Sequence, residues 1–229
     1  MAKQKITHHP TYKGMVIQTD SQRGLGCIEN ILGGMHERLT YMTNKHKQVS
    51  VVELVVTLPK SVSPENATQV VADAIRSVRK TMSNQKKETQ TCWTREMATI
   101  ADHDRPHYNV AFITDGSKCQ SGMGIKDHLQ RLIAKRSSDP VNDPGNVHCC
   151  KYENDYQDLH PIEKASAMKI RQDKPGADKQ FENVFNRFSY DAKISQKGNA
   201  APGQREFGFS QLPRINKRAD NSSLRIDQV

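Results

Sequence analysis

His107 and Asn109 are two side chains able to bind divalent metal ions, and they lie on one β-forming run over residues 107–113. Alternate residues of a strand share a face, so both would point the same way. Glu96 belongs to another β-rich run, 91–97, and would lie beside them if the two strands pair. Imidazole, carboxylate and amide oxygen suit an open Mg²⁺ or Mn²⁺ site that leaves positions for water and a phosphate. The alternative is that His107 only forms hydrogen bonds at the start of a hairpin strand.

A helical pattern over residues 179–194 carries a tyrosine that could act as a nucleophile. The i, i+3, i+4, i+7 spacing predicts a buried apolar stripe of Phe181, Val184, Phe185 and Phe188. The roughly opposite side holds Asn183, Asn186, Tyr190 and Lys193. Because Tyr190 and Lys193 are i, i+3 neighbours, the ammonium can stabilise a phenolate or hold the phosphate that it attacks. The alternative is a half-exposed tyrosine beside a solvated lysine.

Positive charge is concentrated in two regions of the chain. The formal net charge is +9, from 34 Lys and Arg against 25 Asp and Glu. Residues 76–87 hold five Lys or Arg and no acid, and residues 169–218 hold eleven against five acids. Such regions attract phosphate backbones, although a solvated basic surface is the simpler alternative. The residues predicted to contact DNA are Arg76, Arg79, Lys80, Lys86, Lys87, Arg95, Arg105, Asn183, Asn186, Arg187, Lys197 and Arg205.

The predicted elements follow the order strand, helix, strand, strand, helix, strand, helix. They cover residues 51–58, 65–82, 91–97, 107–113, 125–136, 147–152 and 179–194. This order is typical of the α+β ferredoxin/RRM-like fold, an antiparallel sheet with helices packed on one face and the other face free. The free face would be a platform for nucleic acid.

The length of 229 residues predicts one domain with appendages. Residues 1–46 are predicted to be an N-terminal arm with a short or broken helix, 47–211 the folded domain, and 212–229 a polar tail. Five cysteines without a CxxC spacing indicate neither a disulfide framework nor a zinc site. The sequence shows no membrane span or secretory leader, so we expect a cytoplasmic protein.

Four motifs in order carry a family resemblance: CWTRE at 92–96, RPHYNVAF at 105–112, FSYDAK at 188–193 and REFGFS at 205–210. They resemble the inovirus-type replication proteins, which include YagK/YfjJ-like prophage proteins and are similar to HUH endonucleases that initiate rolling-circle replication. The family pattern is W-x-R-E, then P-H-Y-H-V, then S-Y-L-A-K and R-x-F-G-x-S. The resemblance covers residues 50–212 and leaves the first 45 residues and the tail uncovered.

The resemblance implies a role for each candidate residue in an HUH-like nuclease domain over 47–211. Tyr190 would be the nucleophile and Lys193 its companion, while His107, Asn109 and Glu96 would bind Mg²⁺ or Mn²⁺. The sequence departs from the pattern at Asn109, where the family usually has histidine. An amide oxygen still binds a hard cation but is a weaker ligand for softer ions than imidazole.

The function implied by the resemblance is metal-dependent nicking and joining of single-stranded origin DNA through a 5′-phosphotyrosine. The substrate would be single-stranded DNA or an extruded origin hairpin. A host helicase and polymerase would be partners, because the sequence contains no GxxxxGK[ST] phosphate loop. Two alternatives are a single-stranded nucleic-acid binding or regulatory protein that has lost cleavage, and a relaxase-type mobilisation enzyme.

Overall fold

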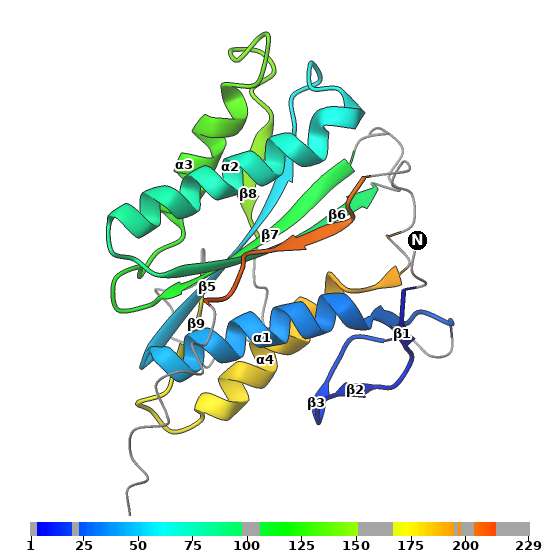
Figure 1. Ribbon diagram of the computed structural model, residues 1–229, viewed down its shortest axis with the longest axis vertical. Helices are drawn as coiled ribbons and strands as arrows, with labels where there is room; N and C mark the ends of the chain where they lie inside the picture. Colours follow the sequence, from blue (N-terminus) through cyan, green and yellow to red (C-terminus); the bar gives the residue numbers. More distant parts are fainter. Residues whose placement is uncertain are drawn as a thin grey trace, which may run out of the picture.

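The computed structural model describes residues 4–19, 23–97, 106–150, 167–194, 197 and 204–213. Its centre is an antiparallel sheet in the order β10-β6-β7-β5-β8, and a further strand, β9, pairs with β5 (Figure 1). β8 pairs with the end of β5 and β9 with its beginning. The strands are β5 (Gln48–Thr57), β6 (Thr89–Met97), β7 (Pro106–Asp115), β8 (Asn146–Cys149), β9 (Met168–Arg171) and β10 (Phe207–Phe209).

Helices α2 (Pro64–Asn84) and α3 (Met123–Ala134) cover one face of this sheet. Proline suits the first helical turn, where its missing N–H is not needed. The apolar stripe of α2 packs with one set of alternating strand residues: Val52, Leu54, Val56, Tyr108, Val110 and Phe112. The helix and strand patterns predicted this layer.

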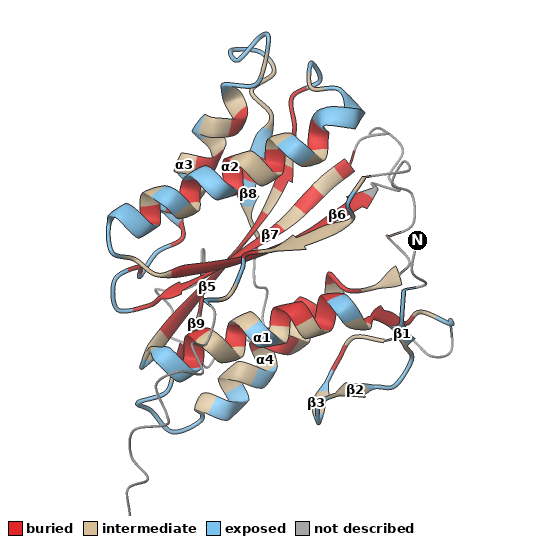
Figure 2. Ribbon diagram, viewed as in Figure 1, coloured by how far each residue is buried: buried red, intermediate tan, exposed pale blue. Residues whose placement is uncertain are grey.

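The other face of the sheet is also covered, which corrects the prediction of a free face (Figure 2). Helices α1 (Glu29–Lys45) and α4 (Ala177–Tyr190) pack there against the second set of strand residues, including Val49, Val51, Ala111 and Ile113. The physical reason is that β5 is apolar on both sides, as in strands that are buried between two layers. The predicted stripe of α4 is confirmed for Val184, Phe185 and Phe188, which are all buried.

The N-terminal part of the chain belongs to the core and is not an appended arm. α1 is an uninterrupted helix of 17 residues, although Gly33 and Gly34 suggested a break. A β-carbon at Gly34 would overlap the Phe209 ring, so this glycine allows β10 to approach the helix. Four short strands precede α1 and form two pairs: β1 (Ile6–Thr7) with β4 (Cys27–Ile28), and β2 (Thr11–Tyr12) with β3 (Met15–Val16).

Two further outcomes concern the ends of the elements and the membrane. α4 ends at Tyr190 and not at 194 as predicted. Of the predicted tail, 212–229, the part from residue 214 onward lies outside the described residues. Among the helices that the structure describes, none combines the length and apolarity needed to cross a bilayer.

Candidate active site

Glu96 and His107 face each other across the pairing of β6 with β7. The His107 Nε2 atom lies 3.1 Å from Glu96 Oε2. The Glu96 side chain is 3% exposed and that of His107 is 28% exposed. The strand pairing therefore places these two predicted ligands side by side, with the imidazole nearer to solvent.

The second carboxylate oxygen of Glu96 accepts a hydrogen bond from Lys197 Nζ at 2.9 Å. Burial raises the pKa of Glu96, but the contacts with His107 and Lys197 outweigh burial and hold it below its ordinary value. Glu96 is therefore ionised near neutral pH. Lys197 was predicted to contact DNA, but its side chain is only 2% exposed and is committed to this buried ion pair.

Asn109 connects the sheet to the end of α4. Its Nδ2 donates a hydrogen bond of 3.0 Å to Asp191 Oδ1, and Asp191 directly follows Tyr190. Asp191 is buried, and burial together with the negative charges of Glu53 and Glu96 raises its pKa well above the ordinary value. The Asp191 carboxyl is therefore protonated well above the pH at which a solvated aspartate ionises.

Glu53 is a site residue that the sequence analysis missed. It lies on β5 with 5% of its side chain exposed and accepts a hydrogen bond of 3.1 Å from Arg187 Nε on α4. A charged residue inside the run VVELVV was the signal that could have revealed it, because a carboxylate in a buried strand needs a partner. Arg187, predicted to contact DNA, is held at the site by this ion pair.

Tyr190, the candidate nucleophile, is the last residue of α4 and is half-buried. Lys193 Nζ lies 4.3 Å from the centroid of its ring, and Arg187 Cζ lies 5.4 Å from it. Both distances are within the range of cation–π contacts. The helical i, i+3 spacing predicted for Lys193 is not present, because α4 ends at Tyr190, but the ammonium still lies against the ring, and Arg187 adds a second positive charge.

Residues near the N-terminus hold the segment that follows α4. Ile28 N donates to Ala192 O at 2.8 Å, and Ile194 N donates to Gly26 O at 3.0 Å. One turn earlier, Asn186 Nδ2 donates to Val16 O at 3.1 Å. Asn186 was predicted to contact DNA, and here its amide fixes the N-terminal segment against α4. No local pattern indicated this contact, because the partners are 170 positions apart.

The remaining predicted DNA contacts are scattered over the molecule. Arg95 is buried at 6% exposure beneath α2, so its side chain does not reach a DNA backbone in this structure. Arg205 is exposed just before β10, Asn183 is half-buried on α4, and Arg105 lies outside the described residues.

The basic segment 76–87 lies at the opposite end of the sheet from His107. Six residues of β6 separate Gln90, which is near this segment, from Glu96, a distance of about 20 Å at about 3.3 Å per residue. Arg76, Lys80 and Lys86 are exposed, whereas Arg79 and Lys87 are partly buried. The structure therefore does not bring the predicted basic segment to the candidate nucleophile.

The predicted metal ligands fit a small divalent ion in their chemistry but not as a complete set. Two ligand atoms of an octahedral ion at about 2.1 Å are about 3 Å apart, which matches the 3.1 Å between His107 Nε2 and Glu96 Oε2. Within the part of the chain that the structure describes, no group of three His, Cys, Asp or Glu residues is arranged to hold a metal. A third protein ligand would have to be of another kind, such as the amide oxygen of Asn109.

These features define an α+β protein with a buried cluster of charged residues where the end of α4 meets the sheet. A family model, the YagK/YfjJ C-terminal domain, matches residues 7–210, so the chain belongs to this family. The matched range begins earlier than the predicted 50–212, in agreement with the packing of the N-terminal residues. No curated protein and no solved structure matches the chain significantly.

Proposed function

We propose that this protein nicks and rejoins single-stranded DNA through Tyr190, as an HUH-type initiator of rolling-circle replication. The observation that carries the proposal is the hydrogen bond between Asn109 and Asp191, which anchors the residue after Tyr190 to the strand that bears His107. The strand order β6-β7-β5-β8, with α2 and α3 as crossover helices, supports a ferredoxin-like nuclease core.

The proposed reaction is a transesterification that needs no co-reactant. The Tyr190 Oη atom forms a bond to the phosphorus of a phosphodiester while the bond from phosphorus to the 3′ oxygen breaks. The phenol gives up one proton, and the 3′ oxygen keeps the electron pair of the broken bond and takes up one proton. The 5′ phosphate stays on Tyr190, and attack by a 3′ hydroxyl reverses the reaction and rejoins the strand.

Positive charge beside the phenol supports this role for Tyr190. Lys193 and Arg187 both lie near the ring, where their positive charges would favour an approaching phosphate. Arg187 is oriented by Glu53, which restrains the guanidinium at the site. Two cations of the chain itself would thus lie near a phosphate that approaches Tyr190.

The proposal includes Mg²⁺ or Mn²⁺ held by Glu96, His107 and the amide oxygen of Asn109. A bound divalent ion would polarise a non-bridging oxygen of the scissile phosphate. The hydrogen bond to Asp191 uses the amide nitrogen of Asn109. The amide oxygen, which would bind the ion, is not used in this hydrogen bond. Glu96 and His107, which already lie side by side, would hold such an ion together.

Formation of a covalent adduct tests the proposal directly. The full chain would be incubated with Mn²⁺ and a pool of random single-stranded oligonucleotides labelled at the 3′ end, and then analysed on a denaturing gel. A 5′-phosphotyrosine retains the labelled 3′ fragment, so we expect a labelled band at the mass of the protein plus DNA. No labelled protein from any member of the pool would contradict the proposal.

The alternative function is binding of single-stranded nucleic acid without cleavage. It is favoured by the closed contacts of Glu96, whose two oxygens are already engaged by His107 and Lys197. Binding of the pool without any adduct would support this alternative. A relaxase-type mobilisation enzyme would share the proposed chemistry but would cleave a transfer origin instead of a replication origin. A replication initiator would work with a host helicase and polymerase.

A further inference from the structure

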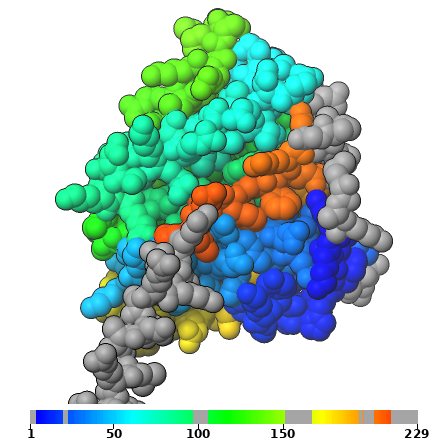
Figure 3. Space-filling view, in the orientation of Figure 1, coloured from blue at the N-terminus to red at the C-terminus, as the bar shows by residue number. Residues whose placement is uncertain are grey.

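A groove lies at the end of the sheet opposite to Glu96 and His107, between α2 and the segment from β10 to Pro213. Its volume is about 810 Å³, and its walls include Arg76, Arg79, Lys87, Gln90, Phe209 and Ser210. In Figure 3, the β10 segment (orange) runs between α2 (teal) and α1 (blue). The groove is therefore separate from the candidate active site, by about 20 Å along β6.

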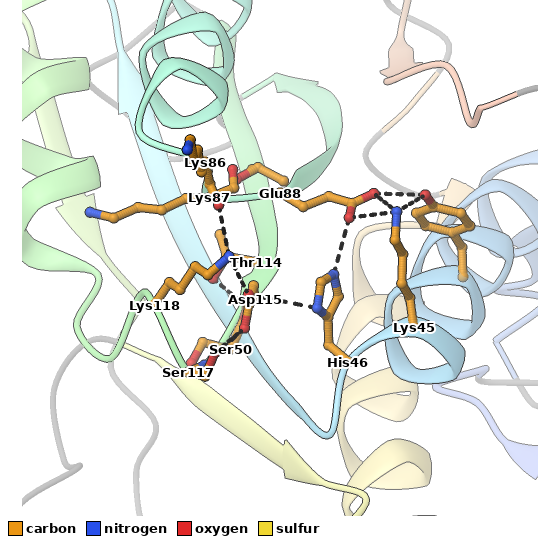
Figure 4. Close-up of polar contacts among 12 residues, drawn as sticks. Lys45, His46, Ser50, Lys86, Lys87, Glu88, Thr114, Asp115, Ser117 and Lys118 are labelled. Atoms are coloured by element: carbon orange, nitrogen blue, oxygen red, sulfur yellow. Dashed lines mark hydrogen bonds and ion pairs between the residues drawn. The ribbon is translucent and has the colours of Figure 1, made fainter.

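Positive charge dominates this groove. Among its described lining residues, Glu88 is the one acid, and it is engaged by α1: Lys45 Nζ lies 2.9 Å from Glu88 Oε2, and Tyr41 donates to Oε1 at 2.6 Å. Figure 4 shows the Glu88 carboxylate directed toward Lys45 and His46. Neutralised in this way, Glu88 does not offset the cations of the groove. Arg76 is itself paired with Asp73 at 2.7 Å, so Arg79 and Lys87 contribute most of the positive charge of the lining.

Further cations border the groove beyond its lining. Lys86 and Lys118 lie next to each other, with Lys118 Nζ donating to the Lys86 carbonyl oxygen at 3.1 Å (Figure 4). Both residues are exposed. Lys118 is also paired with Asp115 at 3.6 Å, so Lys86 continues the positive surface outward from Lys87 at the rim of the groove.

Two guanidinium groups are held close to the floor of the groove. Arg38 lies 4.6 Å from the centroid of the Phe209 ring and donates two hydrogen bonds to Ser210 O, at 2.9 and 2.7 Å. Arg79 is half-buried and donates to Thr89 O at 3.3 Å. Burial, and then the charge of Arg38, lower the pKa of Arg79, although it remains a cation at neutral pH. A bound phosphate would relieve this repulsion.

We propose that this groove is a second DNA site, which binds the sugar–phosphate backbone of a single strand at a distance from the nick. The inference rests on the proposed function in that it takes single-stranded DNA as the ligand. The volume is that of a small-ligand site, enough for a short stretch of one strand, whereas a duplex would touch only the rim.

The test removes two cations of the groove and measures binding of a fluorescent dT20 to the full chain between 50 and 300 mM salt. For Arg76→Gln with Lys87→Gln, we expect the slope of log affinity against log salt to fall by about 1.4, since each phosphate contact on a single strand contributes about 0.7. At 0.1 M salt this corresponds to about 25-fold weaker binding. The matched control, Lys135→Gln with Arg136→Gln, removes the same charge from exposed residues at the end of α3.

Each outcome decides for or against the groove. If the groove pair loses no more dT20 affinity than the control pair, the groove proposal is refuted. If the groove pair loses as much affinity for a 20-base-pair duplex as for dT20, the assignment to a single strand is refuted. Adduct formation by the wild type, together with unchanged dT20 binding by the groove pair, refutes the groove and leaves the nicking proposal standing. Loss of dT20 binding in the groove pair, without any wild-type adduct, supports the groove and refutes nicking.

Discussion

Asn109 and Asp191, separated by 82 positions in the sequence, are joined by a hydrogen bond of 3.0 Å between the sheet and the end of α4. Both depart from the family pattern given above, which has histidine and leucine at these two positions. An asparagine amide needs an acceptor when it is half-buried, and the Asp191 carboxyl oxygen supplies one. The two residues that depart from the pattern are thus in direct contact with each other.

The first prediction concerns Asn109. If its amide oxygen is a ligand, Asn109→Ala removes metal-dependent cleavage, whereas Asn109→His strengthens Mn²⁺ binding because imidazole is the better donor to transition ions. Asn109→His combined with Asp191→Leu restores both positions of the family pattern and should bind Mn²⁺ at least as tightly as Asn109→His alone. Calorimetric titration of Mn²⁺ into each variant measures this, and equal dissociation constants in all of them would remove Asn109 from the site.

The second prediction concerns Tyr190. Tyr190→Phe removes only the nucleophilic oxygen and keeps the ring between Lys193 and Arg187, so adduct formation should fall by on the order of 10³-fold or more, while DNA binding stays nearly unchanged. Tyr12→Phe is the control, because Tyr12 is a partly buried tyrosine whose ring contacts Phe185 away from the end of α4. Wild-type adduct levels in Tyr190→Phe would move the search to Tyr152 and Tyr156.

Local patterns predicted the parts of the fold that local forces determine. The period of two in 107–113 placed His107 and Asn109 on one face, and the pairing of β6 with β7 placed Glu96 beside His107 as expected. The apolar stripe of α4 likewise follows from spacing alone. These elements are recognisable because the spacing of apolar residues within each element shows which of its faces is buried.

The contacts that complete the site are not visible in any local pattern. Arg187 and Glu53 are 134 positions apart, and Lys197 and Glu96 are 101 apart. Spacing rules describe neighbours within one element and carry no information on which distant elements meet. The covering of the second face by α1 was also missed, because Gly34 was taken as a helix break when it provides room for Phe209.

The third prediction concerns the buried ion pair of Lys197 with Glu96. Lys197→Met removes the lysine partner of a buried carboxylate, in a pair whose side chains are both 3% exposed or less, while His107 still contacts Glu96. The free energy of unfolding should therefore fall by up to about 3–5 kcal/mol. Mn²⁺ binding next to the Glu96 carboxylate should recover part of this loss. We therefore expect Mn²⁺ to raise the melting temperature of Lys197→Met more than that of the wild type.

A matched control for this variant is Lys179→Met, which breaks an ion pair of 3.4 Å with Glu182 in which both side chains are exposed. Exposed pairs contribute at most about 1 kcal/mol, so its stability should change little and show no added response to Mn²⁺. The same Mn²⁺ shift in both variants and the wild type would mean that the ion binds away from Glu96.

The fourth prediction is a dependence of stability on pH through Asp115, the carboxylate between His46 and Ser117 in Figure 4. Burial raises the pKa of Asp115, but hydrogen bonds from the Ser117 hydroxyl at 2.6 Å and the Ser117 amide at 3.1 Å, with the charges of His46 and Lys118, outweigh burial. The net pKa lies below the ordinary value of 3.8. A lowered folded-state pKa gives stability that is present above the unfolded value and is lost as the pH falls through the folded value.

Asp115→Asn cannot ionise, so it should lower the free energy of unfolding by about 1–2 kcal/mol at pH 7. The difference from the wild type should shrink at pH 3, because this pH lies below the unfolded-state pKa of about 3.9 and part of the stability has been lost there. Urea unfolding at the two pH values measures it, with Asp127→Asn as the control at an exposed aspartate whose lysine partner is 3.6 Å away. If Asp115→Asn loses the same free energy of unfolding at pH 7 and at pH 3, the contribution of Asp115 comes from hydrogen-bond geometry and not from its charge.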